Sequence, residues 1–296
     1  MLRFLVFTDL HYAEVADGDN RIEEILANAR KRDLDFIVSL GDLCNPVDEN
    51  LKVLKQFKSL GIPFYNAIGN HETDKCKLDE ILNFYSIDKP YYSVVCKGYK
   101  LIFLNSCYLQ NDGKEEIFYK RNFKNEHAVY PIIPTEELHW LQEELNDDMK
   151  CIIFSHHSLV NDFPTRGIYN REEIRKNLVA GKVLFCLNGH DHGDDFSCKD
   201  GIPYMTVNLA NYAWLGGQIA SKKELQEKYS YLQGMLQYKQ AMSAYIEIDS
   251  NEIKISGMDG EYLSVTPDDI ELHDYRWNGV SIRPQISSHV IKVEKL

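Results

Sequence analysis

The chain has 296 residues, of which 44% are hydrophobic and 26% are charged, a composition typical of soluble globular proteins. No apolar run approaches the roughly 20 residues that a membrane-spanning helix needs. The formal charge of −12 comes from 45 acidic and 33 basic residues, and it argues against broad binding to nucleic acids or anionic membranes. An anionic substrate would therefore need cations in its site to offset the surrounding charge.

The first residues and the cysteines both bear on the cellular compartment. Residues 1–7 have the apolar character of a short signal core, but they run directly into Asp9 and His11 without a small-residue cleavage site, so we expect a strand instead. The seven cysteines are odd in number, contain no Cys-x-x-Cys pair and stand partly inside apolar runs. They are typical of buried thiols in a reducing compartment, and we expect a cytoplasmic protein.

The first part of the chain alternates between strands and helices. Nearly continuous apolar runs predict buried strands over 2–8, 36–40 and 63–68. Between them, apolar residues at helical spacing predict helices over 21–31 and 51–60. This order of strands and helices is typical of a largely parallel sheet with crossover helices.

The rest of the chain mixes both patterns. Over 106–133 the periodicity vanishes, and we expect a long loop, which is unusual inside a compact domain and often functional. We expect one domain over 1–296, with a motif-bearing core over 1–212 and C-terminal strands and an irregular tail over 213–296. The remaining predictions are a helix near 78–82, a hairpin over 91–96 and 100–105, a helix from Pro134 with Thr135 as its N-cap, strands over 151–154, 183–187, 202–209, 244–248 and 252–256, a helix over 171–180, and a helix over 221–241 with Leu225, Tyr229, Leu232 and Leu236 on one side.

Five predicted strands end in side chains that can bind a metal ion. In α/β proteins, functional residues collect at the carboxyl ends of strands. Residues i and i+2 of an extended segment point the same way, so the two members of an Asp-x-His or His-x-His pair can hold one ion together. Mixed His, Asp and Asn ligands favour Mn, Fe, Zn, Co or Ni over Ca or Mg. These side chains are Asp9 and His11, Asp42, Asn70 and His71, His156, and His190 and His192.

Each of these residues also has a simpler structural explanation. Asp9 can cap the turn that follows it, and His156 can be a hydrogen-bonded polar group at the edge of the core. Asp42 after Gly41 is common in turns. The recurrence of such residues at five strand ends of one chain favours the metal site, because it would otherwise be a coincidence.

The same residues resemble the signature of the calcineurin-like metallophosphoesterases. That signature has five blocks: Asp-x-His, Gly-Asp, Gly-Asn-His-Glu/Asp, a lone His and Gly-His-x-His. Any one block is unspecific, but the ordered set is very specific, and here it spans positions 9–192. The blocks stand in order as Asp9-x-His11, Gly41-Asp42, Gly69-Asn70-His71-Glu72, His156 and Gly189-His190-Asp191-His192.

The resemblance implies a fold and a set of metal ligands. The fold is of the α/β class, a four-layer αββα sandwich of two facing mixed sheets with a two-metal site at their edge. The cofactors are two divalent or mixed-valence transition-metal ions, of Mn, Fe or Zn. His156 rather than His157 fills the position of the lone histidine. The ligands carried over are Asp9, His11 and His192 for the first ion, Asn70, His156 and His190 for the second, and Asp42 as the bridge between them.

The resemblance also implies a mechanism. Two ions about 4 Å apart can hold a bridging hydroxide as the nucleophile for in-line attack on phosphorus. The proton for the leaving oxygen must come from elsewhere, and a histidine that binds no metal can supply it as a general acid. His71 is that candidate, held in orientation by Glu72 or by another acidic neighbour.

Departures from the patterns of particular subfamilies narrow the substrate. Protein Ser/Thr phosphatases of this superfamily carry Asp-Arg-Gly shortly after the Gly-Asp block, and residues 43–46 lack it. Purple acid phosphatases place a Tyr where Asn45 stands, and nuclease relatives add a basic capping region that the charge balance disfavours. The chain then looks similar to class III cyclic-nucleotide phosphodiesterases and to manganese-dependent ADP-ribose/CDP-alcohol diphosphatases. We therefore expect hydrolysis of a small nucleotide-type phosphodiester or pyrophosphate. A phosphomonoesterase is the alternative, and a non-catalytic scaffold is a further one.

Two segments, 106–133 and 161–170, are expected to form the wall that recognises the group beyond the phosphate. The first concentrates aromatic side chains, whose rings can stack on a base, and basic ones that can meet a second phosphate. Alternatively, the rings merely pin a long insertion to the sheet edge. The expected partner is a small phosphorylated molecule, without broad binding to nucleic acid or membrane, and the oligomeric state stays open. The candidate substrate contacts are Tyr12, Arg121, His127 and Arg166.

Overall fold

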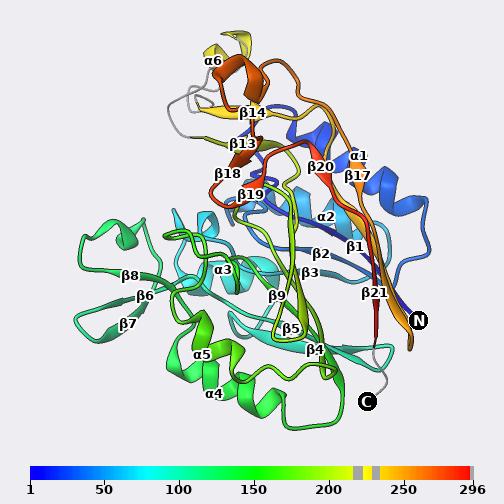
Figure 1. The fold of residues 1–296 in the computed structure, drawn as a ribbon. Helices are drawn as coiled ribbons and strands as arrows, with labels where there is room; N and C mark the ends of the chain where they lie inside the picture. Colours follow the sequence, from blue (N-terminus) through cyan, green and yellow to red (C-terminus); the bar gives the residue numbers. More distant parts are fainter. Residues whose placement is uncertain (216–222, 229–233, 294–296) are drawn as a thin grey trace.

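A computed structural model describes residues 1–215, 223–228 and 234–293 of the chain. Within these residues, two six-stranded mixed sheets face each other, and helices cover their outer sides (Figure 1). The structure thus confirms the predicted four-layer α/β sandwich.

The first sheet consists of β1 (Leu2–Phe7), β2 (Phe36–Ser39), β3 (Phe64–Asn66), β15 (Ala244–Ile248), β16 (Glu252–Ser256) and β21 (His289–Lys292). Its order is β21-β16-β15-β1-β2-β3. Strands β1, β2 and β3 run parallel, as the alternation of strands and helices predicted, whereas β15, β16 and β21 pair antiparallel. Leu2 pairs with Ile248, so the first strand lies inside a sheet that the C-terminal strands complete.

The second sheet consists of β4 (Tyr92–Cys96), β5 (Tyr99–Phe103), β9 (Lys150–Ser155), β10 (Val183–Asn188), β11 (Asp195–Lys199) and β12 (Ile202–Thr206). Its order is β11-β12-β10-β9-β5-β4. The four inner strands are parallel, and the two edge strands β11 and β4 pair antiparallel. The predicted hairpin over 91–105 forms the β4–β5 edge.

Helices lie on both outer faces, as the resemblance implied. Helix α1 turns Ile22, Ile25 and Leu26 to the first sheet, because residues three and four apart share one helical face. None of the helices in the described residues is long and apolar enough to cross a membrane. They are α1 (Gly18–Arg30), α2 (Leu51–Lys58), α3 (Leu78–Tyr85), α4 (Thr135–Glu144), α5 (Arg171–Arg175) and α6 (Lys223–Lys228), with 3-10 turns η1 (Asp48–Asn50), η2 (His71–Thr73), η3 (Asn122–Lys124) and η5 (Pro267–Ile270).

Alternation along β1 divides its side chains between two cores. The Phe4 ring faces the second sheet and lies 5.9 Å from the ring of Phe154. The Phe7 ring faces the opposite way and lies 5.1 Å from the ring of Phe57 on α2. Both faces of β1 are therefore covered, which explains why its sequence is an unbroken apolar run.

Residues 106–133, which we call the insert, do not lack secondary structure, so that prediction is wrong. They form a small antiparallel sheet of order β7-β6-β8, which projects from the body of the molecule in Figure 1. Strand β7 reads Lys-Glu-Glu-Ile and is mostly exposed, so no apolar alternation marked it as a strand. The strands are β6 (Tyr108–Asn111), β7 (Lys114–Ile117) and β8 (Val129–Ile132).

The predicted N-cap of α4 is also wrong. Pro134 occupies the N-cap position, and Thr135 is the first helical residue. The insert supplies the hydrogen-bond acceptor for the first residue of α4 instead. Glu115 of β7 accepts hydrogen bonds from Thr135 N at 3.1 Å and from Thr135 Oγ1 at 2.7 Å. The tip of the insert is thereby tied to the helix.

The helix predicted over 221–241 is wrong in its C-terminal part. Strand β14 pairs with β13, and Leu236 is buried in that hairpin. Tyr229 and Leu232 lie outside the described residues. The helix predicted over 171–180 ends at Arg175, and the tail contains short strands rather than irregular chain alone. The remaining strands are β13 (Tyr212–Trp214), β14 (Met235–Gln237), β17 (Met258–Asp259), β18 (Arg276–Trp277), β19 (Val280–Ser281) and β20 (Gln285–Ile286).

Glu137 of α4 is a buried carboxyl group that makes stability depend on pH. Its Oε1 accepts a hydrogen bond from Asn105 N at 2.7 Å, and its Oε2 has no partner among the described residues. Burial raises the pKa of Glu137 well above its ordinary value. The folded chain therefore holds this proton more tightly than the unfolded chain. The resulting stabilisation is fully present below the unfolded pKa of about 4.3 and is lost as the pH rises through the folded pKa.

Glu137→Gln should remove this dependence, because the amide keeps the acceptor for Asn105 and does not titrate. We expect the free energy of unfolding of the variant, relative to wild type, to rise by up to about 1.4 kcal/mol per pH unit between about pH 5 and the folded pKa. Thermal unfolding across this range measures it, with Glu143→Gln, an exposed glutamate of the same helix, as the control. Parallel curves for Glu137→Gln and wild type would contradict the expectation.

Candidate metal centre

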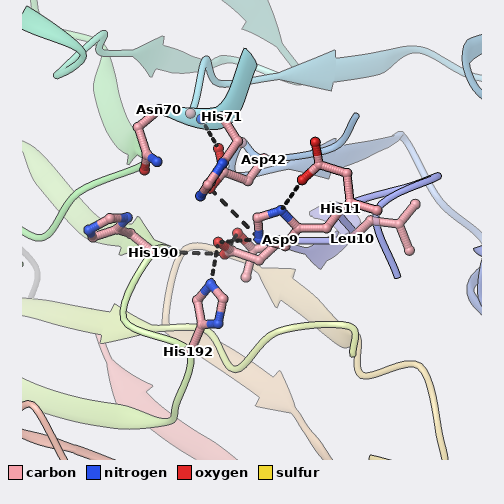
Figure 2. A network of polar contacts seen from close by, with 12 residues as sticks. Asp9, Leu10, His11, Asp42, Asn70, His71, His190 and His192 are labelled. Atoms are coloured by element: carbon pink, nitrogen blue, oxygen red, sulfur yellow. Dashed lines mark hydrogen bonds and ion pairs between the residues drawn. The ribbon is translucent and has the colours of Figure 1, made fainter. Parts of the chain in front are cut away.

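The carboxyl ends of β1, β2, β3, β9 and β10 meet at one edge of the sandwich and deliver the predicted ligands there. Asp9 follows β1, Asp42 follows β2, Asn70 follows β3, His156 follows β9 and His190 follows β10. Figure 2 shows the side chains of His11, Asn70, His190 and His192 arranged around the carboxylates of Asp9 and Asp42.

The first ligand cluster surrounds the carboxylate of Asp9. His192 Nε2 lies 3.2 Å from Asp9 Oδ1. His11 Nε2 lies 3.8 Å from the same oxygen and 3.8 Å from Asp42 Oδ2. Asp9, His11 and His192 are therefore close enough to share one ion.

The second ligand cluster surrounds His156 Nε2. This nitrogen lies 3.2 Å from Asp42 Oδ2 and 3.1 Å from Asn70 Oδ1. It also lies 3.2 Å from His190 Nδ1. Because Asp42 Oδ2 faces both clusters, Asp42 stands where a ligand shared by two ions must stand.

The donor atoms fit a pair of cations. His156 Nδ1 donates to the carbonyl oxygen of Leu40 at 2.9 Å, so the neutral ring carries no proton on the Nε2 that faces the cluster. Asp9 Oδ1 and His11 Nε2 are buried and have no hydrogen-bond partner among the described residues. Buried lone pairs that face one another are costly unless a cation lies between them.

The protonation states of His11 and Asp9 at neutral pH also suit metal binding. Burial lowers the pKa of His11 to about 3, so its ring is neutral. Burial alone would raise the pKa of Asp9, but the close approach of His192 outweighs it and lowers the pKa to about 2. Neutral imidazoles and ionised carboxylates are the forms that bind divalent ions. For His156, burial alone would lower the pKa, but Asp42 outweighs it and raises the pKa to about 10, so an ion that binds there displaces a proton from this ring.

The ligands stand on an unusual backbone. Left-handed conformations of residues other than Gly cost about 1–3 kcal/mol each and cluster at functional sites. Hydrogen bonds join the turn after β1 to the turn after β2, from Asp9 N to Gly41 O at 3.0 Å and from His11 N to Asp42 O at 2.9 Å. The ligands with positive φ are Asp9 (52°), His11 (46°), Asp42 (52°), His190 (64°) and His192 (55°).

Two glycines of the motif blocks are required by close approach. A Cβ on Gly69 would lie 2.2 Å from Asp42 Oδ1, and one on Gly189 would lie 2.0 Å from Thr8 Oγ1. Either side chain would push a ligand-bearing turn away from the cluster. The glycines thus set how closely these turns pack.

Glu72 does not orient His71, which corrects one of the two alternatives for this role. Its fully buried carboxylate accepts hydrogen bonds from the backbone N–H groups of Asp42, Leu43 and Gly69 and from the hydroxyl of Tyr85, at 2.9–3.1 Å. Glu72 therefore joins the two turns that carry Asp42 and Asn70.

Asp74 is the acidic neighbour that orients His71. His71 Nδ1 lies 2.9 Å from Asp74 Oδ2, and His71 Nε2 lies 4.0 Å from Asp42 Oδ2. Burial alone would lower the pKa of His71, but Asp42 and Asp74 outweigh it and raise the pKa to about 9. The ring is therefore protonated at neutral pH and stands next to the ligand clusters. Sequence reasoning missed Asp74, although its i+3 position after a histidine was a usable signal.

Two further aromatic side chains touch the ligands. His157 is buried behind His190, with ring centroids 4.1 Å apart, and its Nδ1 lies 2.8 Å from Ser106 Oγ. Tyr212, which sequence reasoning missed, has its ring centroid 5.1 Å from that of His192 and 5.6 Å from that of His11. No motif marked Tyr212, because its strand β13 follows the last block.

The four predicted substrate contacts fall in different places. Arg166 Nη1 donates to His190 O at 3.0 Å, and its other N–H groups reach Asn278 Oδ1 when that amide is oriented by its neighbours. Arg121 reaches Asp74. Tyr12 is buried and donates to Asp19 at 2.7 Å, whereas His127 is 76% exposed on the insert. A direct contact of any of them with substrate stays a prediction.

The aromatic side chains of the insert pack on one another. Phe118 is 2% exposed, and its ring centroid lies 4.7 Å from that of Phe123. The Phe123 ring lies 5.1 Å from that of Tyr130. This packing favours the alternative that these rings pin the insert to the sheet edge.

Comparisons with known proteins agree with this geometry. A family model of calcineurin-like phosphoesterases matches residues 2–194. Among solved structures, a dimetal phosphatase from Danio rerio is 13% identical, with 90% of this chain and 99% of that chain covered and a TM-score of 0.62. GAP50, the anchor in the inner membrane complex of Plasmodium, is 12% identical, with 95% and 96% covered and a TM-score of 0.52. At these identities the two structures show a shared fold and nothing further. A search of curated proteins finds no match.

The matched segment covers more than half of the chain and contains all five motif blocks. Its ligands converge in two clusters that share one aspartate. The chain therefore belongs to the calcineurin-like phosphoesterase family.

Proposed function

We propose that the chain hydrolyses a small phosphodiester or pyrophosphate of the nucleotide type, with two ions of Mn, Fe or Zn as cofactors. The observation that carries the proposal is the position of Asp42 Oδ2, which lies 3.8 Å from His11 Nε2 in one ligand cluster and 3.2 Å from His156 Nε2 in the other. When bound at such a site, two ions supply a nucleophile derived from water at neutral pH and positive charge for the phosphoryl oxygens.

His71 supplies the proton for the leaving oxygen in this proposal. With Nδ1 donating to Asp74, its Nε2 carries the proton that faces the ligand clusters. Hydrolysis adds one water across the phosphorus–oxygen bond, His71 gives its Nε2 proton to the departing alkoxide or phosphate, and solvent restores it. A general acid of this kind contributes roughly 10²- to 10⁴-fold in rate.

The hydrogen bonds of two arginines to protein groups support a diester substrate over a monoester substrate. A phosphomonoester brings a dianionic phosphoryl group, whereas a diester carries one negative charge on phosphorus, as does each phosphorus of a nucleotide pyrophosphate. Arg121 and Arg166, the two arginines predicted as substrate contacts, are both hydrogen-bonded to protein groups. Arg121 is paired with a carboxylate and the N–H groups of Arg166 are taken by neutral protein groups, so few guanidinium donors are left for a substrate phosphate.

Two alternatives stay open. The name of the Danio rerio dimetal phosphatase favours a phosphomonoesterase, and the name of the Plasmodium anchor favours a scaffold. Against the scaffold, this chain keeps all seven predicted ligands and His71 in a converging arrangement. We also propose a small phosphorylated substrate, without broad binding to nucleic acid, and a reducing, cytoplasmic setting, which the seven free cysteines support.

A screen of metals against substrates tests the proposal. Chain stripped of metal is reloaded with Mn, Fe(II), Zn or Co and assayed on bis-p-nitrophenyl phosphate, p-nitrophenyl phosphate, cyclic nucleotides, ADP-ribose and CDP-alcohols. Activity on the diesters or pyrophosphates that exceeds activity on the monoester is the expected result. Preference for the monoester would favour the phosphatase alternative, and no turnover with any metal would favour the scaffold.

Asp42→Ala should abolish activity and the binding of at least one ion, because it removes the carboxylate that faces both clusters. Metal content by mass spectrometry and turnover of bis-p-nitrophenyl phosphate measure the two effects. Asp42→Asn, which keeps the size of the side chain, is a second variant in case Asp42→Ala misfolds. Asp148→Ala, at an exposed aspartate, is the control. Two ions per chain together with wild-type turnover in Asp42→Ala would rule out the shared ligand.

His71→Ala should keep its metals and lose turnover of substrates with poor leaving groups by roughly 10²- to 10⁴-fold. Because p-nitrophenolate hardly needs a proton, hydrolysis of bis-p-nitrophenyl phosphate should fall much less. His139→Ala, an exposed histidine on α4, is the control. Equal losses on both kinds of substrate would indicate that His71 is structural or a ligand.

Phe163→Ala should weaken binding of nucleotide substrates. Phe163 is 49% exposed on the segment whose Arg166 contacts His190, whereas the insert rings are packed away. Stacking of a base is worth about 1–3 kcal/mol, so KM for such substrates should rise about tenfold. Hydrolysis of bis-p-nitrophenyl phosphate, which has no base, should stay nearly unchanged. Equal effects on both substrates would remove Phe163 from the recognition wall.

A further inference from the structure

We propose that Arg121 is a positioning residue for His71, and that the insert exists in part to deliver it. The proposal rests on the proposed function, because it treats His71 as the proton donor. It assigns a role in catalysis to a segment that contributes no metal ligand.

The contacts converge on a single oxygen. Asp74 Oδ2 accepts from His71 Nδ1 at 2.9 Å, from Arg121 Nε at 3.0 Å and from Arg121 Nη2 at 2.5 Å. The other carboxylate oxygen, Asp74 Oδ1, is buried and has no hydrogen-bond partner among the described residues. The guanidinium therefore fixes which oxygen of Asp74 faces the histidine.

The burial of Asp74 explains why the guanidinium is needed. The side chain of Asp74 is 8% exposed, whereas that of Arg121 is 48% exposed. A carboxylate that is mostly removed from water is destabilised unless charged donors pair with it. Without Arg121, the carboxylate gains by rotating toward water, and the ring of His71 loses its fixed acceptor.

The insert holds Arg121 on a packed turn. Lys120 N donates to Thr73 O at 3.1 Å, two residues from His71, and Phe118 N donates to Cys107 O at 2.8 Å. Lys120 and Arg121 both have left-handed backbones, with φ of 49° and 59°. Residues other than Gly keep this conformation only where neighbouring contacts impose it. The turn is thus built to bring Arg121 to Asp74.

Fixing Asp74 fixes the orientation of the His71 ring. When Nδ1 donates to Asp74, the remaining proton sits on Nε2, the nitrogen that lies 4.0 Å from Asp42 Oδ2. A loosened Asp74 lets the ring turn, and a smaller fraction of molecules then points the Nε2 proton toward the ligand clusters. The loss should appear in kcat, and it should grow as the leaving group becomes more basic.

This expectation separates positioning from direct contact with substrate. An arginine that binds a substrate phosphate lowers KM for every substrate that carries that phosphate, whatever the leaving group. An arginine that orients the proton donor leaves KM alone and matters only where a proton is needed.

The kinetic test uses metal-loaded Arg121→Met and Arg121→Lys on thymidine 5′-phosphodiesters whose second alcohol runs from p-nitrophenol through phenol to methanol. Lys114→Met, an exposed lysine of β7, is the matched control. For Arg121→Met we expect kcat to fall about tenfold for the least acidic leaving groups, a fraction of the full effect of a general acid, and less than about twofold for p-nitrophenol. Arg121→Lys should restore part of the loss. A uniform loss across the series, or a raised KM with unchanged kcat, would overturn the proposal.

A second readout does not depend on activity. In metal-free chain with ¹⁵N-labelled histidine, the Nδ1 proton of His71 should give a downfield resonance that Arg121→Met broadens or removes and Lys114→Met preserves. Persistence of this resonance in Arg121→Met would overturn the positioning role. If the wild-type chain with any metal hydrolyses none of the esters, the proposed function fails, and this resonance alone then decides whether Arg121 fixes His71.

Discussion

The carboxylate of Glu72 holds the candidate site together. It takes hydrogen bonds from the N–H groups of Asp42, Leu43 and Gly69, which belong to the turns after two neighbouring strands. The spacing of the two turns, and hence of Asp42 from Asn70, is therefore set by one side chain as well as by the sheet. Three buried N–H groups without an acceptor would each cost about 1–3 kcal/mol, so the arrangement depends on this carboxylate.

The backbone conformation and the buried charges of the site cost free energy, and packing between the two sheets offsets this cost. Five ligands have left-handed backbones, and two ionised carboxylates are almost fully buried. The offset comes from the core between the sheets, where the rings of Phe4 and Phe36 stack at 4.7 Å and those of Phe103 and Phe154 stack at 4.8 Å. Three of the strands that carry these rings, β1, β2 and β9, also carry ligand turns, so the packing that stabilises the fold also fixes those turns in converging positions.

The features that depend on local sequence pattern were predictable, whereas contacts between residues far apart in the chain were not. Unbroken apolar runs identified the central strands, and the polar residues after them identified side chains that converge at one sheet edge, because both follow from local order. Asp74 and Arg121 are 47 residues apart, and nothing in either segment indicates that the two side chains meet. The helix predicted through Leu236 failed for a related reason, since helical spacing of apolar residues does not reveal that β13 pairs with this segment. Glu115 at the start of α4 is another partner that only the folded insert provides.

The pairing of β1 with β15 has a consequence for how the chain folds during synthesis. Every motif block lies before residue 193, yet the strand that carries Asp9 is flanked on one side by Ala244–Ile248. A ribosome that has released all the ligands has therefore not yet released the strand that completes their sheet. Contacts between such distant segments form late and slow folding, so the nascent chain exposes one edge of β1 while its histidines and aspartates are already outside the exit tunnel. The sheet that carries the turns of Asp9 and Asp42 is therefore complete only after the C-terminal strands dock.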